Sequence, residues 1–408
     1  MGAGAAALVG GLAWRALHGS QLVDSGSPAA PLETRARAAA PPQPAPLGSA
    51  SAASVPAPSG YATSVPAGGP ADADPALATL EREDPQGERV DHDIDKVLDW
   101  LSRTPGGVQA LESWIVGQNG RYDTGAAWPR IALAALGACE LHEARGALRA
   151  LATRRELSPA LRLHAVMHLG RKSGLAASDV EVLTALAAER EPTPGARSSM
   201  VASGALSTLG SIAREGRLDD PGLREGALAT VRTALLTETE PAYLAAAVNG
   251  AAASGDATLL PALEPLAGHA NHDVRAALAT GLDQVAGGVD ASWAVDWAHR
   301  ETAAQVRASL ARAAAASAAR ANAAPAEPWA TWAIEALPRE RGTAATALIA
   351  VVGAAAHAGS APARDALLTR FAAERRLGAK ADAAVLRELG RHLEATTLAA
   401  TLAAGSHP

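Results

Sequence analysis

A six-residue pattern, Ala-[Leu/Val]-x-x-Leu-Gly, repeats along this chain, and few folds suit a chain that repeats itself at such intervals. Strict copies run from Ala132 to Gly137, from Ala165 to Gly170 and from Ala205 to Gly210, and looser copies start at Ala247, Ala277 and Ala347. The six starts lie 33, 40, 42, 30 and 70 residues apart, the last interval being about two units. This period is typical of repeats built from paired helices.

A second pattern, apolar-x-x-apolar-Ala, follows most copies of the first by 16 to 21 residues and begins at Leu148, Leu183, Leu263 and Leu368. Each unit therefore predicts helix, short polar turn, helix. Residues three apart share a helical face, so each second helix has a narrow apolar stripe, and we expect Arg145, Glu189 and Arg370 on the opposite face. Because neither helix can bury its stripe alone, successive pairs should stack into a curved α-solenoid.

The turns predict where helices begin and end. Asp220-Pro221 and Ser158-Pro159 each place a capping residue before a proline at the first helical position. Gly137, Gly170 and Gly210 stand where a left-handed residue would end a helix. No alternating strand pattern occurs from residue 91 to 401. We predict an all-α body over residues 89–404 with about eight helix pairs.

One stretch resembles a known family. Residues 271–278 read Asn-His-Asp-Val-Arg-Ala-Ala-Leu, which is similar to the HEAT-repeat signature of armadillo-like α-solenoids. The resemblance implies that Asp273 caps a helix and that Asp273 and Arg275 join a ladder of Asp and Arg side chains along the stack. Val306-Arg307 and Leu161-Arg162 match in part but lack the Asp. The resemblance covers about 310 residues and implies binding to macromolecules without specifying a ligand.

The N-terminal residues differ in composition from this body. Residues 3–14 are uncharged and apolar, but they are fewer than the roughly 20 that a spanning helix needs. Residues 1–17 fit a truncated signal, an anchor, a segment with a mis-assigned start, or a frayed alanine-rich tail. Residues 18–88 hold twelve of the 26 prolines, and we expect a disordered linker. A tether at the cell envelope, in the periplasm or at the inner membrane, follows from this order; the cytoplasm is the alternative.

Composition excludes several classes of site. The single cysteine, Cys139, cannot form an internal disulfide or supply paired thiolates to a metal. A net charge of −6 gives no reason to expect nucleic-acid binding. Alanine forms roughly a quarter of the chain and buries little area per side chain, so the helices must pack closely. With only three lysines against many arginines, the composition indicates a GC-rich bacterial genome. Residues 2–7 imitate a dinucleotide fingerprint without its preceding strand, and no P-loop occurs.

Three histidine or acidic groups invite a metal hypothesis. His164 and His168 stand four apart on one predicted helix, but Ala165 stands where a zinc protease would have its glutamate. Solvent-facing or interhelical histidines are the favoured interpretation. Asp91, His92, Asp93 and Asp95 more simply complement a helix N-terminus, and His269, His272 and Asp273 form a turn cluster. We therefore assign no metal, cofactor-binding or catalytic residue.

Two further groups suggest catalysis, and one segment a membrane span. Some HEAT-like DNA glycosylases hold a base with tryptophans and a carboxylate, as Trp293, Asp296 and Trp297 could, but the nearby charges are balanced. We expect Trp297 and Trp332 to be packing residues. Cys139 with His142 lacks an evident orienting group, so a half-buried structural thiol is the default. The uncharged run 343–363 is too short in its apolar part to span a bilayer and should be an inner helix.

These features favour a noncatalytic, monomeric scaffold or adaptor that binds a protein partner, with the helices of the second pattern on the concave side. No nucleic acid is expected, and membrane contact is expected only through the N-terminal segment. A carrier of lipid or another apolar ligand is the first alternative. A HEAT-like enzyme of the DNA glycosylase type is the second.

Overall fold

The computed structural model of the chain describes residues 90–119, 128–190, 200–320 and 323–405. The chain divides into two compact units, residues 1–67 and 68–408, and every described residue belongs to the second unit. Its described residues form seventeen α-helices, α3 to α19, and no β-strand. The all-α prediction is confirmed. The predictions for residues 1–17 and 18–88 lie outside the described residues.

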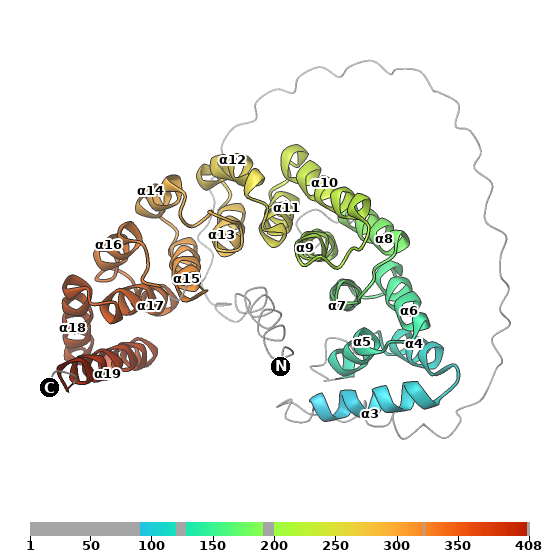
Figure 1. Cartoon of the computed structure of the whole chain (residues 1–408), viewed down its shortest axis with the longest axis horizontal. Coiled ribbons are helices and arrows are strands. Elements are labelled where there is room, and N and C mark those ends of the chain that lie inside the picture. Colours follow the sequence, from blue (N-terminus) through green and yellow to red (C-terminus); the bar gives the residue numbers. More distant parts are fainter. Residues whose placement is uncertain (1–89, 120–127, 191–199, 321–322, 406–408) are drawn as a thin grey trace, which may run out of the picture. The chain divides into compact units, whose positions relative to one another are not determined.

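The α-helices of the second unit lie in two rows (Figure 1). The inner row consists of α5 (Trp128–Ala138), α7 (Pro159–Gly170), α9 (Met200–Arg214), α11 (Pro241–Ser254), α13 (His272–Gly281), α15 (Ala304–Arg320), α17 (Gly342–His357) and α19 (Ala383–Gly405). The outer row consists of α4 (Gly107–Gly117), α6 (His142–Thr153), α8 (Ala177–Ala187), α10 (Pro221–Thr237), α12 (Leu260–Leu263), α14 (Ser292–Arg300), α16 (Glu327–Ala336) and α18 (Ala361–Arg376). These rows make the eight predicted helix pairs of an α-solenoid, and α3 (Val90–Arg103) packs on α5 at its start.

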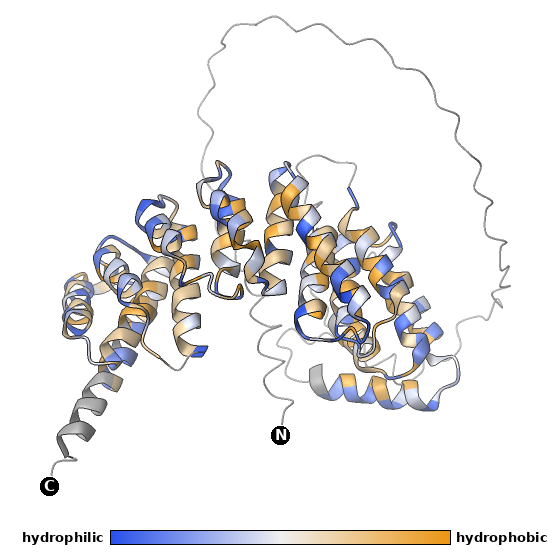
Figure 2. Ribbon diagram, turned by 45° about the horizontal axis from the view of Figure 1, so that its top comes forward, coloured by the Kyte–Doolittle hydropathy of each residue, from blue (hydrophilic) through white to orange (hydrophobic). Residues whose placement is uncertain are grey.

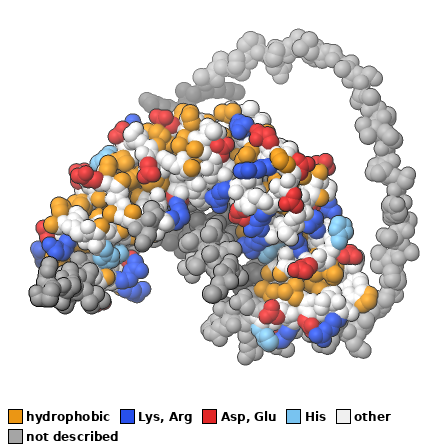
Figure 3. All heavy atoms as spheres, viewed as in Figure 1, with side chains coloured by type: hydrophobic (Ala, Val, Ile, Leu, Met, Phe, Trp, Pro, Cys, Tyr) orange, Lys and Arg blue, Asp and Glu red, His pale blue; other side chains and the backbone are white. Residues whose placement is uncertain are grey.

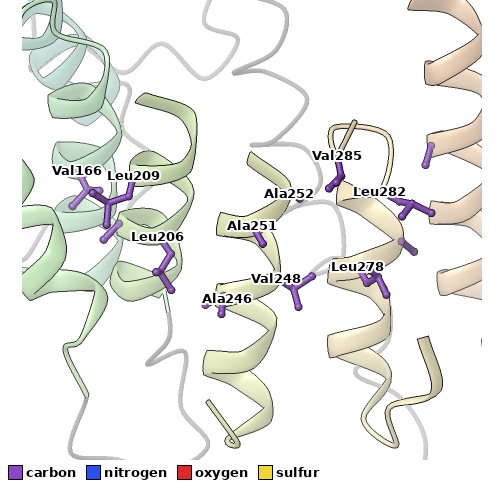
Figure 4. Close-up of a cluster of buried hydrophobic side chains, with 14 of the residues drawn as sticks. Val166, Leu206, Leu209, Ala246, Val248, Ala251, Ala252, Leu278, Leu282 and Val285 are labelled. Atoms are coloured by element: carbon purple, nitrogen blue, oxygen red, sulfur yellow. The ribbon is translucent and has the colours of Figure 1, made fainter. Parts of the chain in front are cut away.

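The core runs along the seams between consecutive inner helices. Figure 4 shows Val166 of α7 with Leu206 and Leu209 of α9, and Val248 of α11 with Leu278 of α13. All five side chains are at most 2% exposed. In the hydropathy view the hydrophilic residues gather at the turns and helix ends (Figure 2). Each repeat therefore buries its apolar surface against its neighbours, as expected for a solenoid.

Glycine and alanine let the inner helices approach to backbone contact. A Cβ on Gly210 of α9 would lie 2.3 Å from the Gly250 carbonyl oxygen of α11, and one on Gly170 would lie 2.2 Å from the Thr208 side chain. Neither these glycines nor Gly137 has a positive φ. The predicted left-handed C-cap role is therefore wrong for all three. The Gly of the repeated pattern allows close packing between helices.

The predicted helix starts are confirmed at two turns. The Asp220 carboxylate accepts a hydrogen bond from the Gly222 N–H at 2.7 Å, with Pro221 opening α10. The Ser158 hydroxyl accepts one from the Leu161 N–H at 3.3 Å, with Pro159 opening α7. These caps work because the side-chain oxygen satisfies an N–H that the first turn leaves without an intrahelical partner.

The two rows correct the prediction about the concave side. Helices that carry the second pattern, such as α6, α8 and α18, form the outer row, and those of the first pattern form the inner row. On α18 the apolar stripe is also shifted by one residue, because Leu367 is fully buried while Leu368 is 49% exposed. Arg370 is buried rather than on a solvated face, and it donates to the Leu337, Pro338 and Glu340 carbonyl oxygens.

Candidate partner-binding surfaces

On α9 and α11 the inner face of the solenoid carries small, uncharged side chains. On α9 the partly exposed positions Ser203, Ser207 and Ser211 recur every fourth residue, because α8 and α10 cover the opposite side of that helix. Partly exposed positions Ala245 and Asn249 continue this surface on α11. Such short side chains leave the helix backbones close to the surface. A polypeptide could therefore lie close against this face.

A groove of about 620 Å³ opens between η3 (Glu264–Gly268) and α14. The residues that line it are Glu264, Pro265, Ala267, Gly268, His269, Ala270, Arg275, Trp293, Trp297, Arg300, Glu301 and Thr302. The volume lies within the range of small-ligand and peptide-anchor pockets. It combines aromatic, small apolar and charged side chains from two consecutive repeats.

Irregular outer helices account for this groove. Pro261 and Pro265 break the outer segment of this repeat into η2 (Ala257–Leu259), the single turn α12, and η3, since proline cannot donate the hydrogen bond that continues a helix. On the η3 side the groove is lined by the small residues Ala267, Gly268 and Ala270. A Cβ built on Gly268 meets no atom within 4 Å. Small side chains thus leave open the space that longer outer helices would fill.

The floor of the groove is an arginine–glutamate pair. Arg275, the fourth residue of α13, donates to the Glu301 carboxylate through Nε at 2.8 Å and Nη2 at 3.0 Å, and its Nη1 donates to the His269 carbonyl oxygen at 2.7 Å. The Glu301 side chain is 2% exposed and also accepts hydrogen bonds from the Trp297 indole at 3.0 Å and the Ala303 N–H at 2.8 Å. This two-point geometry fixes η3, α13 and α14 to one another.

The same pairing recurs along the stack and corrects the predicted Asp ladder. Arg162 and Arg307 are also fourth residues of inner helices, and they pair with Glu189 and Glu340, which follow outer helices. Arg307 also donates to the Glu301 carbonyl oxygen at 2.9 Å, which links its own pair with Glu340 to the pair of Arg275 and Glu301. By contrast, Asp273 is exposed and Asn271 caps α13 instead. The ladder consists of arginine–glutamate pairs. Arg275 therefore belongs to a ladder, as predicted, and Asp273 does not.

Glu301 makes the stability of this region depend on pH. Burial alone would raise the pKa of its carboxyl group, but the hydrogen bonds from Arg275, Ala303 and Trp297 outweigh burial and lower the pKa from 4.5 to about 2. A carboxyl group whose pKa is lower in the folded state stabilises the fold above its unfolded pKa. That contribution is lost as pH falls through the folded value.

We expect Glu301→Gln to lower the free energy of unfolding by about 3 kcal/mol or less near neutral pH. The gap between variant and wild type should narrow as pH falls from 4.5 to about 2, because in that window the unfolded wild-type chain binds a proton at this carboxylate while the folded chain keeps it charged. Urea unfolding of both chains, followed by circular dichroism across that range, measures the gap. A gap that stays constant across the range would show that this carboxylate is not the titrating group.

Two stacked tryptophans form one wall of the groove. The rings of Trp293 and Trp297 have centroids 6.3 Å apart and an interplanar angle of 27°. Trp297 is 3% exposed, as expected of a packing residue, whereas Trp293 is only partly buried. Trp332 is likewise buried, at 2% exposure. Asp296 is exposed and is not among the residues that line the groove. The structure thus brings the two tryptophans together without Asp296.

The histidines and acids considered for metal binding take other roles. His168 packs against α5 at Gly137, and burial, with the nearby charges of Arg171, His164 and Lys172, lowers its pKa to about 3. Asp93 pairs with Lys96 at 3.2 Å in α3, and His272 lies 3.2 Å from Asp273 at the surface. Among the described residues no three His, Cys, Asp or Glu side chains gather as a metal would require.

The remaining described sequence candidates lie on the helices or in the turns between them. Cys139 is buried, and its carbonyl oxygen accepts a hydrogen bond from the buried Lys172 ammonium. His142 is exposed at the start of α6. The uncharged run 343–363 forms α17 of the inner row and the start of α18. None of the described helices is long and apolar enough to cross a bilayer. Residues 2–7 lie outside the described part of the chain.

Solved structures share this architecture at low sequence identity. Yeast importin-β is 12% identical over 79% of this chain and 46% of its own length, with a TM-score of 0.51. An engineered protein is 20% identical over 79% of this chain and 88% of its own, with a TM-score of 0.34. A designed armadillo repeat protein is 14% identical over 66% and 99% of the two chains, with a TM-score of 0.26.

The class of protein follows from the fold. The paired helices, the two rows and the similarity to importin-β define a HEAT/armadillo-like α-solenoid. This is the architecture that the resemblance at residues 271–278 implied. No family model matches the sequence, and no curated protein does. The chain spans less than half the length of importin-β.

Proposed function

We propose that this protein is a noncatalytic scaffold that binds a protein partner along the inner face of its solenoid. The observation that carries the proposal is the continuous inner row from α5 to α19, whose exposed side on α9 and α11 is built from short side chains. Stacked helix pairs of this kind create extended concave binding surfaces. A surface this long offers contacts to a polypeptide over many repeats.

The character of this face favours a protein over the two alternatives. Ser203, Ser207, Ser211 and Asn249 offer hydrogen-bonding groups, whereas a lipid carrier would need large apolar side chains around a cavity. A nucleic-acid enzyme would need a basic surface. In Figure 3 the Lys and Arg side chains are interspersed with Asp and Glu over the face in view. Mixed charge of this kind suits contacts with proteins.

The proposal predicts that long charged side chains on the inner face weaken partner binding. Ser207→Arg combined with Asn249→Arg should reduce recovery of the partner about tenfold or more, because two uncompensated charges would stand where the partner approaches. The matched control is Thr233→Arg, which adds the same side chain at an exposed position of the outer helix α10. Affinity capture with mass spectrometry, followed by pairwise binding with the purified partner, measures the effect.

Two results would contradict the proposal. One is equal binding by the double variant and wild type when circular dichroism shows both to be folded. The other is recovery of lipid or nucleic acid in place of a protein. Capture made separately from membrane and soluble fractions also tests the envelope location, which we propose from the sequence of residues 1–88 alone.

A further inference from the structure

The groove between η3 and α14 has a composition unlike that of the inner face. Its exposed wall is the Trp293 indole, backed by the stacked Trp297 ring. The wall opposite carries Pro265 and Ala267, and Gly268 leaves open space beside it. An aromatic plane facing a small apolar wall can hold a flat, rigid, apolar group between them.

The charges in the groove balance one another. Arg275 and Glu301 neutralise each other at the floor through two hydrogen bonds. Glu264 and Arg300, both exposed, contribute one further charge of each sign. A charged side chain brought down to this floor would find no free counter-charge and would lose its hydration. The groove therefore complements a segment that is uncharged at its centre.

The aromatic wall of the groove offers such a segment a hydrogen-bond donor. The Trp297 indole N–H is committed to Glu301. The Trp293 indole N–H has no hydrogen-bond partner within the described part of the chain. A polyproline II segment has no internal hydrogen bonds, so its carbonyl oxygens are free to accept from such a donor. Proline rings also stack well on aromatic surfaces, and proline-rich peptides dock in aromatic-lined grooves.

We propose that this groove binds a proline-rich segment of a partner protein in the polyproline II conformation, with a proline ring against Trp293. Because the segment is already extended and stiff, little conformational entropy is lost on binding. The site uses outer-row elements, so it goes beyond the proposed function of the inner face. Experiments can therefore contradict the proposal for the groove while the proposal for the inner face stands, and the reverse.

The test is fluorescence anisotropy of the full chain with a labelled ten-residue peptide of repeated Ala-Pro-Pro units. A peptide with serine in place of proline is the control ligand. The wild type should bind the proline peptide saturably and the serine peptide at least about tenfold more weakly. Trp293→Ala should weaken binding about tenfold or more, because tryptophans in such positions contribute a large share of binding energy. Trp293→Phe keeps a ring but removes the N–H, so its affinity for the proline peptide should lie between those of the wild type and Trp293→Ala.

A second variant guards against a folding defect in Trp293→Ala. Gly268→Phe adds a side chain where a Cβ meets no atom within 4 Å, so it should fold normally and obstruct the groove. Leu368→Ala removes an exposed side chain from α18, away from the groove, and should bind as wild type does. Unchanged binding in both groove variants, or no preference for proline over serine, would overturn the proposal. So would the absence of saturable binding to the wild type.

Discussion

Leu183→Asp is expected to unfold the repeats around α8. Leu183 is fully buried in the outer helix α8, which packs on α6, α9 and α10. The substitution removes a buried leucine and places a carboxylate there without a partner, so it should cost about 4 kcal/mol or more. Leu263→Asp, at a fully buried position of α12, should act in the same way. Because solenoid stability is shared among neighbouring repeats, we expect a broadened transition at a lower temperature.

Leu236→Asp provides the matched control for this prediction. Leu236 lies on the next outer helix, α10, and is 65% exposed, so the same substitution there should change stability by about 0.5 kcal/mol or less. Thermal unfolding by circular dichroism and calorimetry compares the two. Equal melting temperatures for Leu183→Asp and wild type would mean that the buried faces of the outer row are misassigned.

Gly210→Ala and Gly226→Ala should change stability in opposite directions. A Cβ on Gly210 would lie 2.3 Å from the Gly250 carbonyl oxygen and 2.8 Å from the Ser254 N–H nitrogen, and both are backbone atoms that cannot move aside alone. The substitution should separate α9 from α11 and cost about 1–3 kcal/mol. A Cβ on Gly226 of α10 meets nothing within 4 Å, so alanine there should add about 0.5–1 kcal/mol.

Urea unfolding of the two variants measures this difference in sign. Because both glycines lie within α-helices, helix propensity alone would make both substitutions stabilising. Stabilisation by both would therefore show that α9 and α11 are not in backbone contact. Gly250→Ala should repeat the Gly210→Ala result from the other side of the seam, since its Cβ would lie 3.0 Å from the Leu206 carbonyl oxygen.

The Ala-[Leu/Val]-x-x-Leu-Gly pattern correctly marks helices, but two predictions drawn from the repeats are wrong: the glycine C-caps and the choice of the concave row. A glycine at the end of an apolar motif predicts a helix C-cap, but α9 continues to Arg214 beyond Gly210. The residues after Gly210 are Ser-Ile-Ala-Arg, which are compatible with a helix that goes on. The concave row was misassigned for a related reason. Helices made largely of small apolar residues, such as α11, are covered on several sides, and that marks the inner row.

The arginine–glutamate ladder could have been found in part from sequence. Arg162, Arg275 and Arg307 all stand at the fourth position of a helix, and capping residues at Ser158 and Asn271 mark the start of two of them. The partner of Arg275, Glu301, lies 26 residues further along the chain and follows an outer helix. No local pattern links the two positions, because the pairing depends on how consecutive repeats dock. The Asp273 expectation failed because Asn271 already caps the same helix.

Local chemistry was enough to predict the helices, the N-terminal caps at Ser158 and Asp220 and the number of pairs, because periodicity, proline and capping side chains act over a few neighbouring residues. Docking between repeats decided the rest. Which row lies inside, which glycines touch a neighbouring backbone, and where a groove opens beside Trp293 all depend on atoms about 25 to 45 residues apart in the chain. Those contacts arise only when the stacked helices settle at distances set by their smallest side chains.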